Sequence, residues 1–236
     1  MHTYKGTSFA EAYQKSLTDL IDNGDLCETR GTTSRELLNV SLEITDPSQC
    51  MYTNMARSTQ TKYIAAEFLW YYAGRNDVAF ISKYAKFWEQ IQNPNGTANS
   101  AYGNLIFKPK SLGGITQYEW AVASLAKDKD SRQAILHFNT PEHQYNGNKD
   151  FVCTMYGIFH IRHNKLNFSV YMRSNDAIWG TPTDVAFFCS LQMQALAHLK
   201  EFYPELELGT YTHHANSYHV YDRHYDLVSR MLLGEF

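Results

Sequence analysis

Apolar positions recur along the chain at two spacings, one typical of helices and one typical of strands. Helical spacing runs through residues 9–21, 63–72, 77–91, 118–125, 184–199 and 225–232. Alternation between apolar and polar residues runs through 38–44, 134–138, 151–162 and 166–173. Because the strands alternate or form hairpins while helices interrupt them, the pattern predicts an α+β fold with a mixed β-sheet and helices on one face.

Local signals place several element ends. Ser8 and Glu11 form a capping box that predicts a helix start, and Asn23-Gly24 predicts its end. His163-Asn164-Lys165 predicts a hairpin turn, and Asp184 is predicted to open a helix of about five turns. Four residues, Leu38, Val40, Leu42 and Ile44, are predicted to share the buried face of one strand.

Composition narrows the function classes. The chain has 236 residues, no repeat and no linker-like tract, which predicts one domain over residues 1–236. A net charge of -3 gives no general attraction to nucleic acid, so no direct nucleic-acid binding is expected. No signal peptide begins the chain and no apolar run approaches 18 residues, so we expect a cytoplasmic protein without a membrane anchor.

The four cysteines, Cys27, Cys50, Cys153 and Cys189, are widely spaced. Without a Cys-x-x-Cys pair, neither a metal knuckle nor a redox dithiol is expected. Free thiols fit an intracellular protein, and a buried cysteine is more often core filler than a nucleophile.

The densest group of ligand-like residues is the stretch 172–184, where a strand runs into a helix. Arg173 and Ser174 suit a phosphate, Asp184 can face a polar heterocycle from the start of a helix, and Asn175 and Asp176 lie beside them. Two further arginines, Arg30 and Arg132, also lie at strand ends, so the three together could form a phosphate cradle. The simpler interpretation of each arginine is an exposed surface residue.

Two other residues complete a chemical hypothesis. Cys153 is a thiol that a positive field could activate, although a core thiol is the simpler reading of its strand. Glu67 lies in an apolar helix, where burial would raise its pKa, although a solvent-facing Glu is equally compatible. Together with the arginines they describe a site in which a thiolate attacks a nucleoside monophosphate.

The same residues resemble the thymidylate synthase family. The resemblance is carried by Cys153, Arg173-Ser174-x-Asp176, Gly180 and the polar residue 184, and it extends over most of the chain. It includes Thr29-Arg30-Gly31-Thr32, Glu67-Phe68-Leu69-Trp70, Trp88, Asn95-Gly96, Tyr102-Gly103, Asp130-Ser131-Arg132 and His219-x-Tyr221. Within the family, 99–103, 151–154, 172–176 and 218–224 look more like phage deoxycytidylate hydroxymethylases than methylating synthases.

The resemblance implies a covalent mechanism and a set of roles. Cys153 would add to carbon 6 of a pyrimidine, whose carbon 5 would take a one-carbon unit from 5,10-methylene-tetrahydrofolate, without a metal. The implied nucleotide-binding residues are Arg30, Arg173, Ser174, His219 and Tyr221, with Arg132 supplied by the second subunit of a homodimer. Glu67 would organise water for proton transfer, Tyr102 would lie near the thiol, and Trp88, Asp176 and Gly180 would form the folate side.

This chain differs from the methylating members of the family at positions that bear on the choice of base and on phosphate binding. Uracil-specific members carry Asn where this chain has Asp184, and an ionised carboxylate accepts hydrogen bonds but donates none, which predicts cytosine. An ordinary helix N-cap aspartate is the alternative. Val152 and Thr154 replace the usual Pro and His around the cysteine, and Gln133 replaces a second arginine, which removes one positive charge from the cradle.

Three functions remain open from the sequence. Only Glu235-Phe236 follow the last predicted helix, and without a closing tail water could add to the one-carbon unit. This favours 5-hydroxymethylation of dCMP. The alternatives are C5-methylation of dCMP, CMP or dUMP, and a catalytically silent protein that binds nucleotide or RNA.

Overall fold

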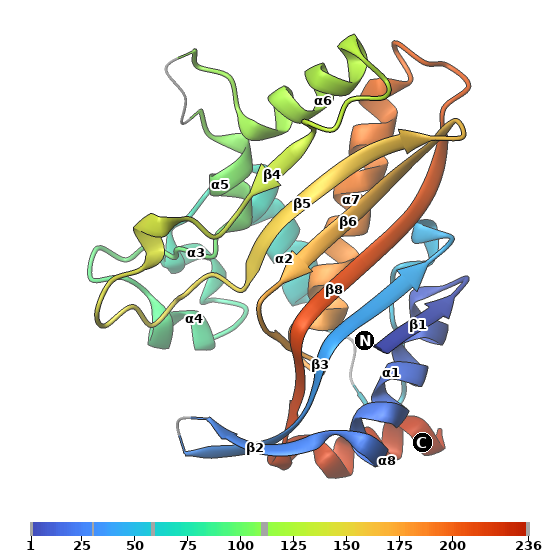
Figure 1. The fold of residues 1–236 in the computed structure, drawn as a ribbon. Helices are drawn as coiled ribbons and strands as arrows, with labels where there is room; N and C mark the ends of the chain where they lie inside the picture. Colours follow the sequence, from blue (N-terminus) through green and yellow to red (C-terminus); the bar gives the residue numbers. More distant parts are fainter. Residues whose placement is uncertain (1, 30, 58–59, 110–112, 235–236) are drawn as a thin grey trace. The chain divides into compact units, whose positions relative to one another are not determined.

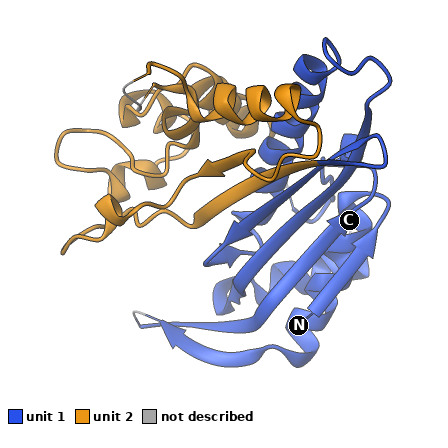
Figure 2. Cartoon of the chain, turned by 45° about the horizontal axis from the view of Figure 1, so that its top comes forward, with its two compact units in different colours: residues 1–59, 161–236 blue, residues 60–160 orange. Residues whose placement is uncertain are grey.

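The computed structural model describes residues 2–29, 31–57, 60–109 and 113–234. The chain divides into two compact units, coloured separately in Figure 2. Unit 1 comprises residues 1–59 and 161–236, and unit 2 comprises residues 60–160. Strand β5 (Thr154–Arg162) begins in unit 2, and its last two residues belong to unit 1.

Unit 1 contains most of a mixed β-sheet (Figure 1). Its strands are β1 (His2–Gly6), β2 (Asp25–Thr29), β3 (Thr32–Ile44), β6 (Lys165–Met172), β7 (Asn175–Asp176) and β8 (Glu207–Tyr221). They follow the order β1-β3-β8-β6, in which β1 pairs parallel with β3, β3 antiparallel with β8, and β6 parallel with β8. The predicted mixed sheet of an α+β fold is therefore confirmed.

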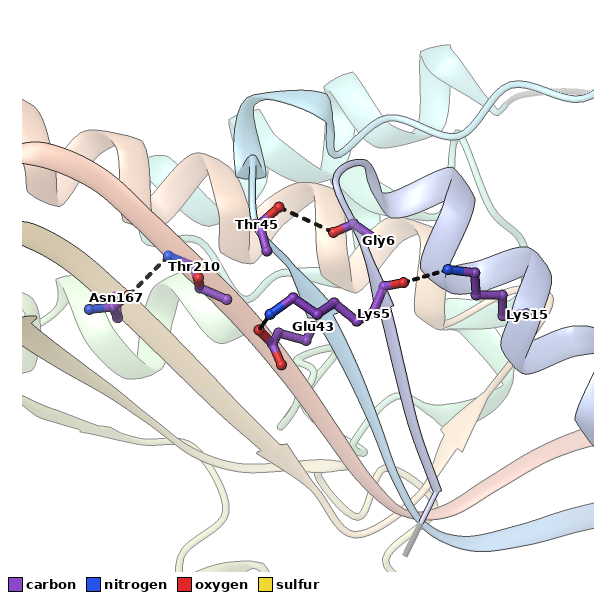
Figure 3. Close-up of polar contacts among 7 residues, drawn as sticks. All are labelled: Lys5, Gly6, Lys15, Glu43, Thr45, Asn167 and Thr210. Carbon is purple, nitrogen blue, oxygen red and sulfur yellow. Dashed lines mark hydrogen bonds and ion pairs between the residues drawn. The ribbon is translucent and has the colours of Figure 1, made fainter.

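Polar contacts tie the strands of unit 1 to one another and to a helix (Figure 3). Lys5 Nζ donates to Glu43 Oε1 at 2.6 Å across the β1–β3 pair. The backbone N–H of Thr210 donates to Asn167 Oδ1 at 2.9 Å where β6 and β8 meet. The first contact is exposed and the second is half-buried, and bonds of this kind fix strand register more than they stabilise the fold.

The helices of unit 1 are α1 (Phe9–Asn23), η1 (Pro47–Gln49), α7 (Thr181–Leu199), η3 (Asp222–His224) and α8 (Tyr225–Leu233). Helix α1 begins as predicted, because Ser8 Oγ accepts from the backbone N–H of Glu11 at 3.3 Å. Helix α7 begins at Thr181, three residues before the predicted start at Asp184. Pro182 explains the difference, since it lacks a backbone N–H and suits the first turn of a helix.

The central strand pair contains a break in its pleat. Asn39 adopts a φ of 56°, opposite Asn216, whose Nδ2 donates to Asn39 Oδ1 at 3.1 Å. The break reverses the alternation of β3, so that Leu37 is buried and Leu38 is 56% exposed. The prediction that Leu38 faces the core with Val40, Leu42 and Ile44 is therefore wrong.

Unit 2 is mainly helical. Its elements are α2 (Thr61–Tyr72), α3 (Val78–Ile81), α4 (Phe87–Ile91), α5 (Tyr102–Phe107), α6 (Gln117–Lys127), β4 (Ile135–His137), η2 (Pro141–His143) and the start of β5, which pairs antiparallel with β4. The single helix predicted from Asp77 to Ile91 is wrong. Tyr84 and Phe87 are 49% and 58% exposed, so this apolar spacing does not mark one buried stripe, and two short helices form instead.

The predicted hairpin turn is confirmed at residues 163 and 164. His163 and Asn164 both have positive φ, 51° and 59°, as a two-residue type I′ turn requires. The turn joins the end of β5 to the start of β6. Within the described ranges, no helix has the length and apolar character needed to cross a membrane.

Candidate active site

The strand-to-helix turn of unit 1 is held in place by backbone pairing. After β6 ends at Met172, the two residues of β7 pair with β8, with Asp176 opposite His219. The N–H of Ala177 donates to the carbonyl of His219 at 2.8 Å, and the N–H of Ser217 donates to that of Arg173 at 3.2 Å. Residues 173–184 and the end of β8 therefore form one cluster, which we call the turn cluster.

Asp184 lies in the first turn of α7 and contacts the turn cluster from the helix. Asn175 Nδ2 donates to Asp184 Oδ2 at 2.8 Å. Gly180 makes this approach feasible, since a Cβ there would lie 2.9 Å from Asn175 Nδ2 and 3.4 Å from Asp184 Oδ2. The sequence therefore places a glycine where the amide and the carboxylate come close to the backbone.

A buried chain of polar groups continues from Asn175 into β8. Thr181 Oγ1 donates to Asn175 Oδ1 at 2.5 Å, and His213 Nε2 lies 3.0 Å from the same oxygen. On the other side of the imidazole, Tyr211 OH lies 2.8 Å from His213 Nδ1. Asn175, Thr181, Tyr211 and His213 are each at most 3% exposed, so every one of these bonds is shielded from water.

Burial fixes the protonation of His213. Removal from water lowers the pKa of His213 to about 3, with a smaller contribution from neighbouring His214. The imidazole is therefore neutral at pH 7 and carries a single ring proton. Since the carbonyl oxygen of Asn175 only accepts, that proton lies on Nε2, and Tyr211 OH donates to Nδ1.

Asp176 and Trp179 present groups that suit a planar heterocycle. Asp176 Oδ1 accepts from the N–H of Ile178 at 2.7 Å and of Trp179 at 3.1 Å, and in the described part of the chain Oδ2 accepts no hydrogen bond. Trp179 is 48% exposed. A carboxylate acceptor beside an exposed aromatic ring fits the pterin of a folate, which offers ring N–H donors and a flat face.

Four of the residues predicted to bind the phosphate and sugar, Arg173, Ser174, His219 and Tyr221, lie in the turn cluster. Arg173 and Ser174 are half-buried at the end of β6, and Ser174 Oγ has no hydrogen-bond partner among the described residues. His219 and Tyr221 are half-buried on β8, with ring centroids 5.1 Å apart. Ser217 Oγ, which donates to Glu36, lies 3.4 Å from His219 Nδ1 and restrains that ring.

Unit 2 holds the predicted catalytic glutamate. Glu67 lies on α2, is 5% exposed, and its Oε1 accepts from Tyr63 OH at 2.5 Å. Burial raises the pKa of Glu67 to about 7, while hydrogen bonds from Tyr63 and Tyr71 lower it in part. Trp88 Nε1 donates to Tyr63 OH at 3.2 Å, so the predicted folate-side tryptophan and the glutamate share one tyrosine.

Cys153 and Tyr102 belong to the same unit. Cys153 is half-buried just before β5, and its Sγ lies 3.9 Å from the carbonyl oxygen of Phe151. Tyr102 begins α5 and stacks on Tyr71, with ring centroids 5.3 Å apart. The neighbouring Gly103 is required by packing, because a Cβ there would lie 1.8 Å from the carbonyl oxygen of Tyr71.

Two of the three arginines predicted as a phosphate cradle are described, and they belong to different units. Arg173 belongs to unit 1, whereas Arg132 is exposed in unit 2, just before β4, beside exposed Gln133. Arg132 makes no hydrogen bond or ion pair within the described ranges, as expected of a side chain that extends away from its own chain. Arg30 lies outside the described residues.

The structure adds three residues that the sequence did not single out, Thr181, His213 and Arg57, and it gives bonding partners to Asn175, one of the polar residues of the stretch 172–184. Arg57 is 4% exposed, donates to the carbonyl of Ile178 at 3.0 Å, and lies 5.8 Å from the centroid of the Trp179 ring. One signal was available for His213, which falls in an otherwise buried alternating stretch of β8. Arg57 carries no comparable signal, because only the fold brings it beneath the turn cluster.

No group of three or more His, Cys, Asp or Glu side chains in the described ranges is arranged to hold a metal ion. Unit 1 offers the hydrogen-bonding groups of the turn cluster, and unit 2 offers a thiol and a buried carboxyl with a raised pKa. Groups of these kinds are typical of enzymes whose side chains act on a small polar substrate.

Comparisons with known proteins agree with this class. Residues 11–235 match the family model for thymidylate synthase. The chain therefore belongs to the thymidylate synthase family, whose members are one-carbon transferases that bind a nucleoside monophosphate and methylene-tetrahydrofolate. The resemblance inferred from the sequence is confirmed.

Two phage relatives and one solved structure illustrate the likeness. The deoxyuridylate hydroxymethyltransferase of Bacillus phage SP01 is 29% identical over 94% of this chain, which spans 59% of that protein's length. The deoxycytidylate 5-hydroxymethyltransferase of Enterobacteria phage T6 is 33% identical over 71% of this chain and 70% of that protein. The thermostable thymidylate synthase A from Bacillus subtilis shares the fold, with a TM-score of 0.76 at 24% identity, covering 96% of this chain and 84% of that one.

Proposed function

We propose that this protein converts dCMP to 5-hydroxymethyl-dCMP, using methylene-tetrahydrofolate and water. The observation that carries the choice of base is Asp184, a carboxylate whose Oδ2 already accepts from Asn175 Nδ2 at 2.8 Å. An ionised carboxylate accepts from the exocyclic amine of cytosine but repels the carbonyl oxygen that uracil carries at the same position.

Cys153 is the nucleophile in this proposal. Its thiolate forms a bond to carbon 6 of cytosine, which makes carbon 5 nucleophilic. Methylene-tetrahydrofolate supplies a one-carbon unit at the oxidation level of formaldehyde. Carbon 5 takes that unit and loses its proton, tetrahydrofolate leaves, and an exocyclic methylene remains on the base.

Water completes the reaction without a change of oxidation state. Its oxygen bonds to the exocyclic methylene, the double bond between carbons 5 and 6 re-forms, and Cys153 leaves as a thiolate. The protons released from carbon 5 and from water equal the two that tetrahydrofolate takes up. Glu67 suits these proton transfers, because burial raises its pKa to about 7, close to the working pH.

The remaining residues of the nucleotide site bind its phosphate and sugar. Arg173 and Ser174 hold the 5'-phosphate together with Arg30, and exposed Arg132 reaches the phosphate of the partner subunit in a homodimer. His219 and Tyr221 bond the sugar 3'-hydroxyl.

On the folate side, Asp176 accepts from the pterin, with Trp88 and Gly180 shaping that part of the site. Tyr102 supports the region of the thiol through its stacking on Tyr71, which also bonds Glu67.

The similarity to phage enzymes supports hydroxymethylation over methylation, because both of the phage relatives described above are named hydroxymethyltransferases. One of them acts on deoxyuridylate, which makes hydroxymethylation of dUMP a second candidate. C5-methylation of dCMP, CMP or dUMP is a third, because the family includes thymidylate synthases. The carboxylate at position 184 favours cytosine among the bases.

Mass spectrometry of the products decides among these candidates. The protein is incubated with methylene-tetrahydrofolate and, separately, dCMP, CMP or dUMP. We expect 5-hydroxymethyl-dCMP together with tetrahydrofolate. A methylated nucleotide formed in step with dihydrofolate would overturn hydroxymethylation, and a clear preference for dUMP would overturn the choice of base.

A further inference from the structure

We propose that Asn175 and His213 are positioning residues that hold the carboxylate of Asp184 in the orientation needed to select cytosine. This inference rests on the proposed function, since it concerns how Asp184 reads the base. It adds two residues outside the roles implied by the family resemblance.

The hydrogen bonds run in one direction. Tyr211 OH donates to His213 Nδ1 at 2.8 Å, His213 Nε2–H donates to Asn175 Oδ1 at 3.0 Å, and Asn175 Nδ2 donates to Asp184 Oδ2 at 2.8 Å. Because each group donates toward the carboxylate, the chain is polarised with its positive ends aimed at Asp184. We call these four side chains the relay.

The amide of Asn175 has only one acceptable orientation. If it were flipped, its carbonyl oxygen would face the carboxylate of Asp184, two acceptors in contact. Its Nδ2 would also meet His213 Nε2 and Thr181 Oγ1, the two groups that donate to Oδ1 in the observed arrangement. The carboxylate of Asp184, which accepts but does not donate, therefore fixes the amide, and Asn175, Thr181 and His213 are each at most 3% exposed, so water does not substitute for their bonds.

The relay also predicts what an amide at position 184 would do. Asn175 Nδ2 can donate only to an oxygen, so an asparagine at 184 would turn its Oδ1 to Asn175 and present its Nδ2 to the base. That donor suits the carbonyl of uracil. Because the relay fixes the side chain at position 184, a carboxylate there presents an acceptor to the base and an amide presents a donor. An unrestrained amide could rotate and present either group.

The test uses Asn175→Leu, which keeps the side-chain shape but removes the donor, and the pair His213→Leu and His213→Gln. Each is assayed with dCMP and dUMP, and the inhibition constant of 2-deoxyribose 5-phosphate, which lacks a base, reports whether the phosphate and sugar site is intact. We expect the dCMP-to-dUMP ratio of kcat/KM to fall at least about tenfold in Asn175→Leu, mainly through KM, as for the loss of one hydrogen bond to a charged group. His213→Leu should behave similarly, and His213→Gln, which retains an N–H donor, should restore most of the ratio.

The outcomes separate this inference from the proposed function. If the unaltered protein prefers dCMP and Asn175→Leu keeps that ratio within about twofold with unchanged 2-deoxyribose 5-phosphate inhibition, the relay is overturned while the function stands. If the unaltered protein shows no preference for dCMP, the proposed function fails. Should Asn175→Leu fail to fold, the two His213 variants decide, because equal ratios in both would overturn the relay.

Discussion

Asn175 Nδ2 and Asp184 Oδ2 lie 2.8 Å apart, although eight residues, which include the turn that joins β7 to α7, separate them in the sequence. The contact depends on Gly180, the residue with no side chain at the point of closest approach. A carboxylate at 184 is therefore an integrated part of the turn cluster and not only a helix-terminal charge. The consequences of changing it can be predicted from the hydrogen bond alone.

Asp184→Asn should shift the preferred nucleotide from dCMP toward dUMP. Asn175 would still donate to an oxygen at position 184, so the fold should tolerate the change, and the amide would offer the base a donor. Loss of a hydrogen bond to a charged group is worth about 1.5–3 kcal/mol, which corresponds to a change of roughly 10- to 100-fold in the ratio of kcat/KM values. Steady-state kinetics with both nucleotides measures it. Asp222→Asn, an exposed aspartate at the start of η3, is the control, and an unchanged preference would mean that the base is read elsewhere.

Cys153→Ala should abolish release of tritium from carbon 5 of dCMP. Without the thiolate, no adduct forms at carbon 6 and carbon 5 does not become nucleophilic. The half-buried thiol makes little contribution to the core, so the melting temperature should change little. Cys27→Ala, another half-buried cysteine, serves as the matched control and should keep full release. Tritium release that survives in Cys153→Ala would remove this residue from the mechanism.

Glu67 should make the protein less stable as the pH rises. Burial raises its pKa from the usual 4.5 to about 7, so between these values the native state retains a proton that the unfolded chain has lost. Stability from this group is full below pH 4.5, falls as the pH rises toward 7, and is lost above it. The raised pKa corresponds to ~3 kcal/mol. Glu67→Gln has no proton to lose and should abolish this dependence.

His213 acts with the opposite sign over an overlapping range, so the unaltered protein does not display the effect of Glu67 by itself. Its pKa is lowered from 6.5 to about 3, so stability from this neutral imidazole is full above pH 6.5 and falls as the pH drops toward 3. The informative quantity is the difference in the free energy of unfolding between Glu67→Gln and the unaltered protein, measured in urea at several pH values. That difference should increase from pH 4.5 to 7, and a constant difference would contradict the raised pKa.

Tyr63→Phe should raise the pKa of Glu67 further. The tyrosine hydroxyl donates to Glu67 at 2.5 Å and stabilises its ionised form. Removing that donor should raise the pKa of Glu67 by about one unit or more. If ionised Glu67 is needed for proton transfer, the acidic limb of the pH profile of kcat should move to higher pH. Tyr84→Phe, which changes an exposed tyrosine of the same unit, should leave the profile in place, and the same result for Tyr63→Phe would exclude this role.

Helices, strands and turns whose signal is a local pattern could be predicted from the sequence. The helix capped by Ser8, the strand containing Leu136 and the hairpin turn at His163 were predicted because their signals span only a few residues. In each case the relevant physics is local, either hydrogen bonding within one turn or the period of apolar positions. The apolar helix around Glu67 left burial and exposure of this side chain equally open, and the structure shows it buried.

The buried face of β3 and the partners of Asn175 could not be predicted, because contacts between distant segments decide them. Leu38 points outward because Asn39 and Asn216, on two different strands, interrupt the pleat together. His213 lies 38 residues from Asn175 in the sequence, and only the parallel pairing of β6 and β7 with β8 brings them within 3.0 Å. The polar residues of the stretch 172–184 predicted a ligand-binding site. The hydrogen-bond partners that orient those residues come from distant parts of the chain.

Gly103→Ala should be among the most destabilising single substitutions in unit 2. A Cβ at this position would lie 1.8 Å from the carbonyl oxygen of Tyr71, so α5 and α2 would have to separate. Overpacking of this kind costs about 3 kcal/mol. Because Tyr71 also bonds Glu67 and stacks on Tyr102, the substitution should lower kcat as well as stability. Gly113→Ala is the matched control, since a Cβ there meets nothing within 4 Å, and urea denaturation of both variants gives the comparison. Equal stability of the two variants would show that α2 and α5 are not packed as closely as the contact between Gly103 and Tyr71 requires.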